Sequence, residues 1–185
     1  MAIYDFRSDT VTLPTPEMMA AVAAARLGDS ARGDDPTVAE LERLGAALTG
    51  KDDALFVPSG TMANLAAVIG HDCRGGEVIV EAGAHIYNSE GGGLSVVAGA
   101  VARPVAGRHG VMDPADVAAA IRAGGDAALA QTRLICLENT HTPPAARSCR
   151  STTWRRSARS PRAPGCRSTS TARGYSTPRP ISASR

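Results

Sequence analysis

Short apolar runs alternate with capped helical segments along the first 141 residues, and this alternation limits the fold more than any other feature. Each run is five or six residues long, the usual length of one β-strand. The runs cover residues 54–59, 77–81, 100–105 and 133–138. Strands separated by helices form a mainly parallel sheet with helices on both faces. The sequence therefore predicts an α/β fold.

Three helices carry clear start signals. In each, a Thr or Asp able to accept backbone hydrogen bonds precedes a proline, which fits the first helical position. The pairs are Thr15-Pro16, Asp35-Pro36 and Asp113-Pro114. Gly50 is placed to end the second helix in a left-handed conformation. A further helix is expected over residues 61–70, directly after the first predicted strand.

Residues 142–185 differ sharply in composition from the rest. All 18 acidic residues lie between Asp5 and Glu138, whereas residues 142–185 contain ten arginines and no acidic residue. Ile181 is the only large aliphatic residue of this tail. So little apolar surface cannot offset the entropy of ordering a chain. We expect two parts, an ordered segment 1–141 and a disordered tail 142–185.

A basic tail can also bind nucleic acid or anionic surfaces through its charge. Beyond isolated Trp154 and Tyr175, however, no aromatic platform for base stacking accompanies the arginines. Nucleic acid therefore remains the less favoured partner.

Nothing in the sequence predicts a membrane or metal protein. No apolar run is long enough to cross a bilayer, and the first residues lack the basic and apolar regions of a signal peptide. We therefore expect a cytoplasmic protein. The four cysteines lie far apart and form no CxxC pair, which favours reduced thiols over a zinc site. They are Cys73, Cys136, Cys149 and Cys166.

The stretch "FVPSGTMANL" carries the first candidate site. A predicted strand ends, Ser59, Gly60 and Thr61 turn the chain, and a helix begins. Backbone N–H groups and hydroxyls at such a turn can bind an anion, and the helix dipole adds to the attraction. The alternative is plain helix capping by the same residues.

The stretch "AHIYNSEGGG" follows the second predicted strand and carries the second candidate site. It places His85 just beyond the strand and Glu90 five residues later. Ligands of parallel sheets bind beyond the carboxyl ends of the strands. We therefore expect His85, Glu90 and the Ser59 turn to meet at one edge of the sheet.

Five segments together resemble the low-specificity L-threonine aldolases, which are pyridoxal-phosphate enzymes of the β-eliminating lyase group. The segments are "FRSDTVTLPTPEM", "GDDPTVAELE", "FVPSGTMAN", "HIYNSEGGG" and "LICLENTH". The resemblance covers residues 3–141 and implies part of the aspartate-aminotransferase-like large domain (PLP fold type I). It also implies cleavage of L-threonine or L-allo-threonine to glycine and acetaldehyde by a homo-oligomer (dimer or tetramer).

The resemblance also implies a role for each candidate residue. Ser59, Gly60 and Thr61 would hold the cofactor phosphate, and His85 would stack on the pyridine ring and take part in proton transfer. Ser8 and Glu90 would contact the substrate, and residues 138–141 would frame the site. These roles come from matched motifs.

Two groups that such an aldolase needs are missing. In the family, a lysine forms a Schiff base with the cofactor and a carboxylate pairs with the pyridine nitrogen, both downstream of the "ENTH" segment. The only lysine here is Lys51, at a different place, and no Asp or Glu follows Glu138. Arg32 also stands where the family has tyrosine. We expect this chain to lack aldolase activity.

A shift in reading frame explains the tail. If one base is lost just after the His141 codon, synonymous codons permit an amphipathic helix, an apolar strand and the family's "HLDGAR" motif. The aspartate of that motif would fall at Thr171 and the arginine at Gly174. Our hypothesis is that residues 142–185 are a frameshift product and that the family sequence is truncated after His141.

Overall fold

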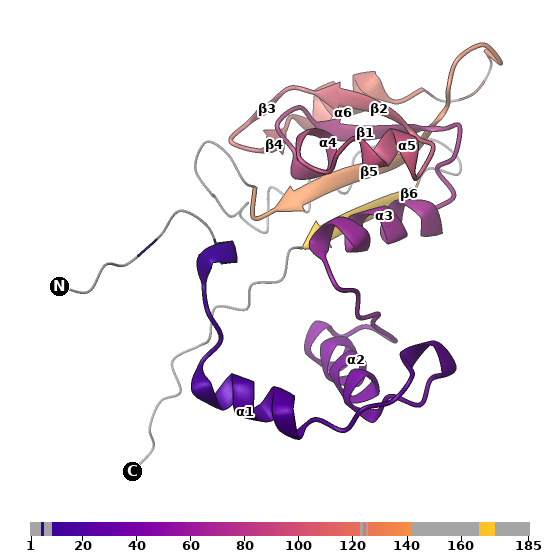
Figure 1. Ribbon diagram of the computed structural model, residues 1–185. Helices are drawn as coiled ribbons and strands as arrows, with labels where there is room; N and C mark the ends of the chain where they lie inside the picture. The colour runs from indigo at the N-terminus through magenta and orange to yellow at the C-terminus, as the bar shows by residue number, and fades with distance from the viewer. Residues whose placement is uncertain (1–4, 6–8, 123, 125, 142–166, 173–185) are drawn as a thin grey trace. The chain divides into compact units, whose positions relative to one another are not determined.

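The computed structural model describes residues 5, 9–122, 124, 126–141 and 167–172 (Figure 1). The chain divides into two compact units, Met1–Phe56 and Val57–Arg185. Each unit is described by itself below.

The first unit is helical. It contains η1 (Asp9–Val11), α1 (Pro16–Ala24), η2 (Ser30–Arg32) and α2 (Pro36–Thr49). The Thr15 hydroxyl accepts a hydrogen bond from the Met18 N–H at the start of α1, as the sequence predicted. A backbone hydrogen bond, and then the Thr15 side chain, lower the pKa of the Glu17 carboxyl in the same turn.

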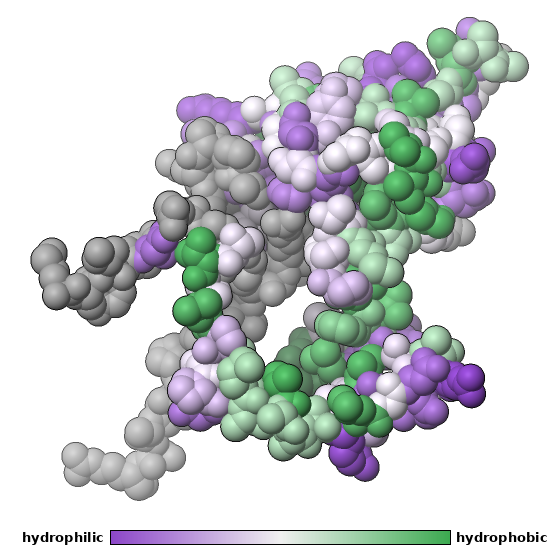
Figure 2. All heavy atoms as spheres, in the orientation of Figure 1, coloured by the Kyte–Doolittle hydropathy of each residue, from purple (hydrophilic) through white to green (hydrophobic). Residues whose placement is uncertain are grey.

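Both ends of α2 are also confirmed. The Asp35 carboxylate accepts hydrogen bonds from the N–H groups of Thr37 and Val38, at 2.9 and 3.0 Å. Gly50 ends the helix with φ = 64°, in the left-handed region that glycine tolerates best. Several large apolar side chains of α1 and α2 are exposed (Figure 2). They include Met18, Met19, Val22, Leu41, Leu44 and Leu48.

The strand predicted at residues 54–59 is wrong. These residues form no strand, and Leu55 is 74 % exposed. Side-chain oxygens accept hydrogen bonds from backbone N–H groups that would otherwise pair with a neighbouring strand. Phe56 donates to Glu42 Oε1 and Ala54 to Asp53 Oδ1, both at 2.8 Å.

The second unit contains a parallel sheet in the order β2-β1-β5-β6 (Figure 1). Its strands are β1 (Glu77–Glu81), β2 (Val101–Val105), β5 (Thr132–Asn139) and β6 (Arg167–Ala172). The first three confirm the other predicted strands. Together they confirm the expected α/β fold.

Helices cover both faces of this sheet. On one face, Val78 and Val80 of β1 pack in a cluster with residues from α3 (Gly60–Gly70), α4 (His85–Asn88) and α5 (Gly93–Val96). On the other face, Ile79 packs with residues from β4 (Val111–Met112) and α6 (Pro114–Ala120). Successive residues of β1 thus point to opposite faces of the sheet and are buried on both, as expected for a sheet covered by helices on each face.

Strand β6 lies within the tail that was expected to be disordered. Its backbone pairs with β5 from Leu134–Arg167 to Asn139–Ala172. At these six residues the structure differs from the expectation. Ladder hydrogen bonds join backbone groups, so a strand can pair without apolar side chains. Residues 142–166 and 173–185 lie outside the described part of the chain.

Candidate functional site

The Ser59 turn begins helix α3. The Ser59 Oγ atom accepts a hydrogen bond from the Met62 N–H at 3.1 Å, so the serine caps the helix. Gly60 and Thr61 occupy the first turn, where N–H groups have no acceptor within the helix. Ser59 and Gly60 are exposed and Thr61 is partly exposed. Ser59 therefore does cap the helix. Capping uses the Met62 N–H and does not use the N–H groups of Gly60 and Thr61.

His85 begins α4, just beyond the carboxyl end of β1. Its backbone N–H donates to Glu138 Oε2 at 2.6 Å, and this bond ties the loop to β5. Its ring Nδ1 lies 2.8 Å from Glu90 Oε1, and the Glu90 side chain is fully enclosed. The structure therefore brings three predicted residues, His85, Glu90 and Glu138, to the same edge of the sheet.

Asn64 completes this group, and it was missed in the sequence. Its Nδ2 donates to Glu90 Oε1 at 2.5 Å, and the residue is only 5 % exposed. The available signal was an amide side chain within the apolar helical stretch "TMANLAAV". Because Asn64 lies on α3, it links the helix that starts at Ser59 to the His85 loop.

Two buried acceptors in this group have no hydrogen-bond partner among the described residues. They are Asn64 Oδ1 and Glu90 Oε2. A cavity of about 10 Å³, the volume of roughly one water-sized probe, lies beside them. It is lined by Asn64, Ala84, His85, Ile86, Cys136, Leu137 and Glu138. The cavity therefore has room for about one water molecule.

Cys136 lines this cavity but is not a nucleophile. Burial, followed by the neighbouring Cys73 and Glu90, raises the pKa of the Cys136 thiol to about 12. The thiolate is the reactive form of cysteine. The Cys136 thiol therefore stays protonated at neutral pH, and its role here is packing in the core.

A second buried pair lies at the same edge of the sheet. Glu81 Oε2 accepts a hydrogen bond from the Gly83 N–H at 2.6 Å and lies 2.8 Å from His141 Nε2. The pair joins the end of β1 to His141, two residues beyond the end of β5. Of the predicted "ENTH" residues, Glu138 thus contacts the His85 loop, while His141 anchors this pair.

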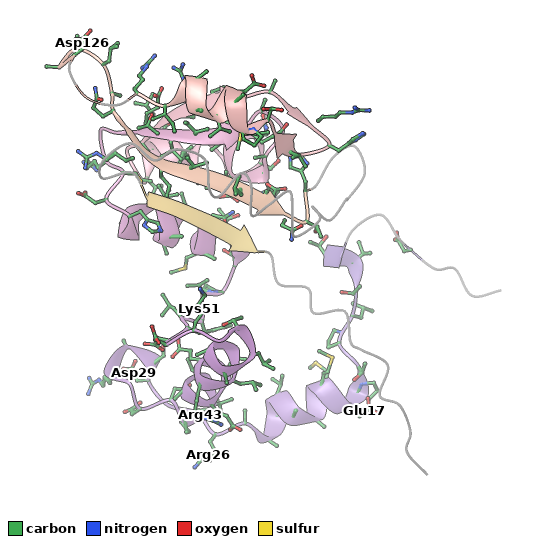
Figure 3. The ribbon with its side chains drawn as sticks, turned by 180° about the vertical axis from the view of Figure 1, so that it is seen from behind. Glu17, Arg26, Asp29, Arg43, Lys51 and Asp126 are labelled. Carbon is green, nitrogen blue, oxygen red and sulfur yellow. The ribbon has the colours of Figure 1, made fainter. Side chains whose placement is uncertain are left out.

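Of two other residues singled out in the sequence, the structure describes one. Ser8 lies outside the described residues. Lys51 follows α2 in the first unit and is exposed (Figure 3). No described lysine therefore belongs to the unit that contains His85.

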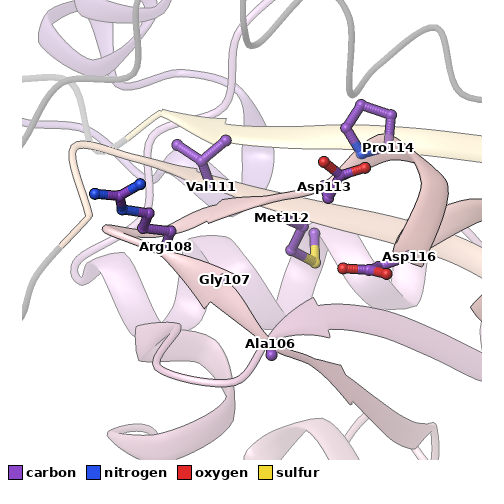
Figure 4. Close-up of a pocket in the computed structure, with 8 residues that line it drawn as sticks. All are labelled: Ala106, Gly107, Arg108, Val111, Met112, Asp113, Pro114 and Asp116. Carbon is purple, nitrogen blue, oxygen red and sulfur yellow. The ribbon is translucent and has the colours of Figure 1, made fainter.

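A second cavity, of about 520 Å³, borders the β3–β4 hairpin, where β3 spans Gly107–Arg108 (Figure 4). Its lining carries one cation and two carboxylates, from Arg108, Asp113 and Asp116. None of the predicted site residues lines it, so its size does not make it the better candidate.

Two kinds of feature are absent from the described residues. No helix there has the length and apolar character needed to cross a membrane. In the same residues, no group of three or more His, Cys, Asp or Glu side chains is arranged to hold a metal ion.

Comparisons with known proteins place the chain in a family. The sequence model of the beta-eliminating lyase family matches residues 5–145. The chain is 46% identical over 150 residues to low-specificity L-threonine aldolase 1 of Arabidopsis thaliana, covering 80% of this chain and 42% of that protein. It is 45% identical over 138 residues to the low specificity L-threonine aldolase of Escherichia coli (strain K12), covering 74% and 41%.

A solved structure of the threonine aldolase of Leishmania major is also similar. The TM-score is 0.57 at 25% sequence identity, and the match covers 68% of this chain and 36% of that one. The fold class expected from the sequence is thereby supported from an independent direction. The chain spans about two fifths of the length of the curated relatives it matches.

Proposed function

The chain belongs to the beta-eliminating lyase family, and we propose that it carries one part of a threonine aldolase site without being an active aldolase itself. The complete site would cleave L-threonine or L-allo-threonine to glycine and acetaldehyde with pyridoxal phosphate. One observation carries the proposal: Asn64 and Glu90 connect α3, which starts at Ser59, to His85.

The residues present fit the phosphate end of this cofactor. The first turn of α3 offers N–H groups, the Ser59 and Thr61 hydroxyls and the positive end of a helix dipole. Gly60 lets an anion approach the backbone closely. His85 would then lie against the ring, and Glu90 beside the substrate. When bound, pyridoxal phosphate acts as an electron sink.

The residues present do not fit covalent attachment of the cofactor. Lys51 is the only lysine, it lies in the first unit, and the tail contains no carboxylate to pair with the pyridine nitrogen. We therefore derive no catalytic step for this chain. It would bind pyridoxal phosphate reversibly, through the phosphate, and release no acetaldehyde.

Titration of the purified chain with pyridoxal phosphate and with pyridoxal, followed by borohydride reduction and mass spectrometry, tests this. We expect binding of the phosphate ester alone, no reducible adduct on Lys51, and no acetaldehyde from L-threonine. Thr61→Val should weaken binding about tenfold, by loss of one hydrogen bond to a charged group.

Thr49→Val is the matched control, since the Thr49 hydroxyl donates to the Gly45 carbonyl within α2. Equal binding of pyridoxal and its phosphate would overturn the phosphate site. A reduced adduct on Lys51 together with acetaldehyde release would overturn the proposed inactivity.

The reading-frame hypothesis has support in the position of β6. The register pairs Glu138 of β5 with Thr171, the position at which the alternative frame restores an aspartate. An aspartate there would stand at the carboxyl end of a strand beside the His85 loop. We retain the division into 1–141 and a shifted tail 142–185 as a proposal.

The partners and location are proposals of the same kind. A small β-hydroxy amino acid, a homo-oligomer of the chain and a cytoplasmic location follow from the resemblance to threonine aldolases. Light scattering of the purified chain tests the oligomer, and a monomer at high protein concentration would contradict it.

A further inference from the structure

Asn64 is an unusual residue for its position. It lies on the buried side of α3, one turn before Val68, which is in the core of the unit. A buried amide costs stability unless its polar atoms are hydrogen-bonded. Only Nδ2 meets this requirement, because Oδ1 has no partner. The single bond that Asn64 makes, to Glu90, is therefore the feature to explain.

Glu90 Oε1 is shared between two groups. Asn64 Nδ2 lies 2.5 Å away and His85 Nδ1 lies 2.8 Å away. For the Glu90 carboxylate to accept a hydrogen bond in this contact, the proton must be on His85 Nδ1. In the neutral imidazole ring the lone pair is then on Nε2. The tautomer of His85 thus depends on where the Glu90 oxygen is held.

We propose that Asn64 is a positioning residue for His85: its amide fixes the Glu90 carboxylate, and the fixed carboxylate holds the ring as the Nδ1–H tautomer. Within the part of the chain that the structure describes, the other Glu90 oxygen has no partner to hold the carboxylate in place. The Asn64 amide is therefore the one donor from a neighbouring helix that restrains it among the described contacts. Asn64 itself does not touch the ring in any of them.

The use of this tautomer rests on the proposed function. A ring with its lone pair on Nε2 is able to accept a proton at that atom, which is what the expected role of His85 requires. The tautomer itself is a property of the chain without cofactor. It can be measured whether or not pyridoxal phosphate binds, so the failure of one proposal is distinguishable from the failure of the other.

The experiment is a long-range ¹H–¹⁵N correlation spectrum of the full chain with ¹⁵N-labelled histidine, in the alkaline range where imidazole is neutral. A His85→Gln variant assigns the resonance. His141 is an internal reference, because its contact with Glu81 is through Nε2 and predicts the opposite tautomer. We expect Nδ1–H for His85 and Nε2–H for His141 in one spectrum.

Asn64→Ala is expected to lower the Nδ1–H to Nε2–H ratio of His85 about tenfold, because the released Glu90 carboxylate no longer holds its charge-assisted hydrogen bond to Nδ1–H. Asn64→Leu removes the same bond while filling the space, and serves where the alanine variant fails to fold. The matched control is Asn88→Ala, since the Asn88 amide donates only to the carbonyls of Ala82 and Ala84. It should leave the ratio unchanged.

Several results would overturn the proposal. An unchanged His85 ratio in folded Asn64→Leu would show that Asn64 only packs against its neighbours. An Nε2–H tautomer of His85 in the unaltered chain would show that Glu90 does not accept from Nδ1. An equal change in Asn88→Ala would show a general loosening of the loop.

Discussion

His141 Nε2 lies 2.8 Å from Glu81 Oε2, and the contact joins the ends of β5 and β1. Both residues are buried. His141→Ala leaves the Glu81 carboxylate enclosed with only the Gly83 N–H as a described partner. Removing one member of a buried pair costs about 3 kcal/mol. Urea unfolding should show a loss of this order in the free energy of unfolding.

The exposed pair of Arg133 and Asp72 provides the control for this prediction. Its atoms lie 3.8 Å apart and both side chains are largely solvated. Surface pairs of this kind contribute about 0–1 kcal/mol, so Asp72→Asn should change stability little. Similar losses in both variants would mean that the Glu81 contact is no more important than a surface pair.

Gly110 lies against the His141 ring, and a side chain there is not tolerated. Its φ is +79°, and an added Cβ would overlap the imidazole atoms of His141. Gly110→Ala therefore combines left-handed strain with a steric clash, and we expect a loss of about 3 kcal/mol in unfolding free energy.

Gly75 isolates the backbone part of that cost. Its φ is +69°, and an added Cβ there meets no atom within 4 Å. Gly75→Ala should cost only about 1 kcal/mol. If the two alanine variants unfold at the same urea concentration, the contact between Gly110 and His141 does not constrain the fold.

Most of the fold was predictable because its signals are local. Capping pairs such as Asp35-Pro36 and apolar runs such as residues 77–81 act within a few residues of the chain. The strand predicted at 54–59 failed because Glu42, 14 residues from Phe56, takes a backbone N–H. The β3–β4 hairpin was missed because each of its strands has two residues, too few for a periodic pattern.

The site was predictable only in part, for a related reason. His85 and Glu90 stand in one loop beyond a strand, where a ligand is expected. Asn64 is 26 residues from Glu90, and only the folded chain shows that its amide meets that carboxylate. The same holds for Glu81 and His141, which are 60 residues apart. Partners so far apart leave no local signal.

The pH dependence of stability should report on Cys136. Burial, then Cys73 and Glu90, raises the pKa of its thiol from 9.0 to about 12. A pKa raised in the folded state gives stability that is present below pH 9 and is lost as the pH rises toward 12. The loss approaches about 1.4 kcal/mol per pH unit, or about 3 kcal/mol by pH 11.

Comparison of the unaltered chain with Cys136→Val isolates this term, because other titrating groups are common to both. Urea unfolding at pH 8 and at about pH 11 should show the larger fall for the unaltered chain. Parallel falls in the two proteins would mean that the Cys136 thiol is not protonated more strongly in the folded state than in the unfolded one.

The reading-frame hypothesis makes a prediction about DNA and about stability. Sequencing of the coding region through the His141 codon should reveal one missing base, after which the codons of residues 142–185 encode an apolar strand ending in "HLDGAR". In the structure β6 pairs with residues 134–139 of β5, and the restored strand would occupy the same residues as β6. Restoring the frame replaces "RSTSTA" by residues able to bury apolar surface. Each Å² of apolar surface buried stabilises the fold by about 25 cal/mol.

The restored chain should therefore unfold at a higher urea concentration than the printed one. Its control is a chain that keeps the printed residues 1–166 and 173–185 but carries "PVHLDG" at 167–172, which separates the strand from the rest of the shifted sequence. A coding sequence with no missing base at this point would contradict the hypothesis. Equal stability of the printed and restored chains would show that residues 167–172 pair with β5 without using apolar side chains.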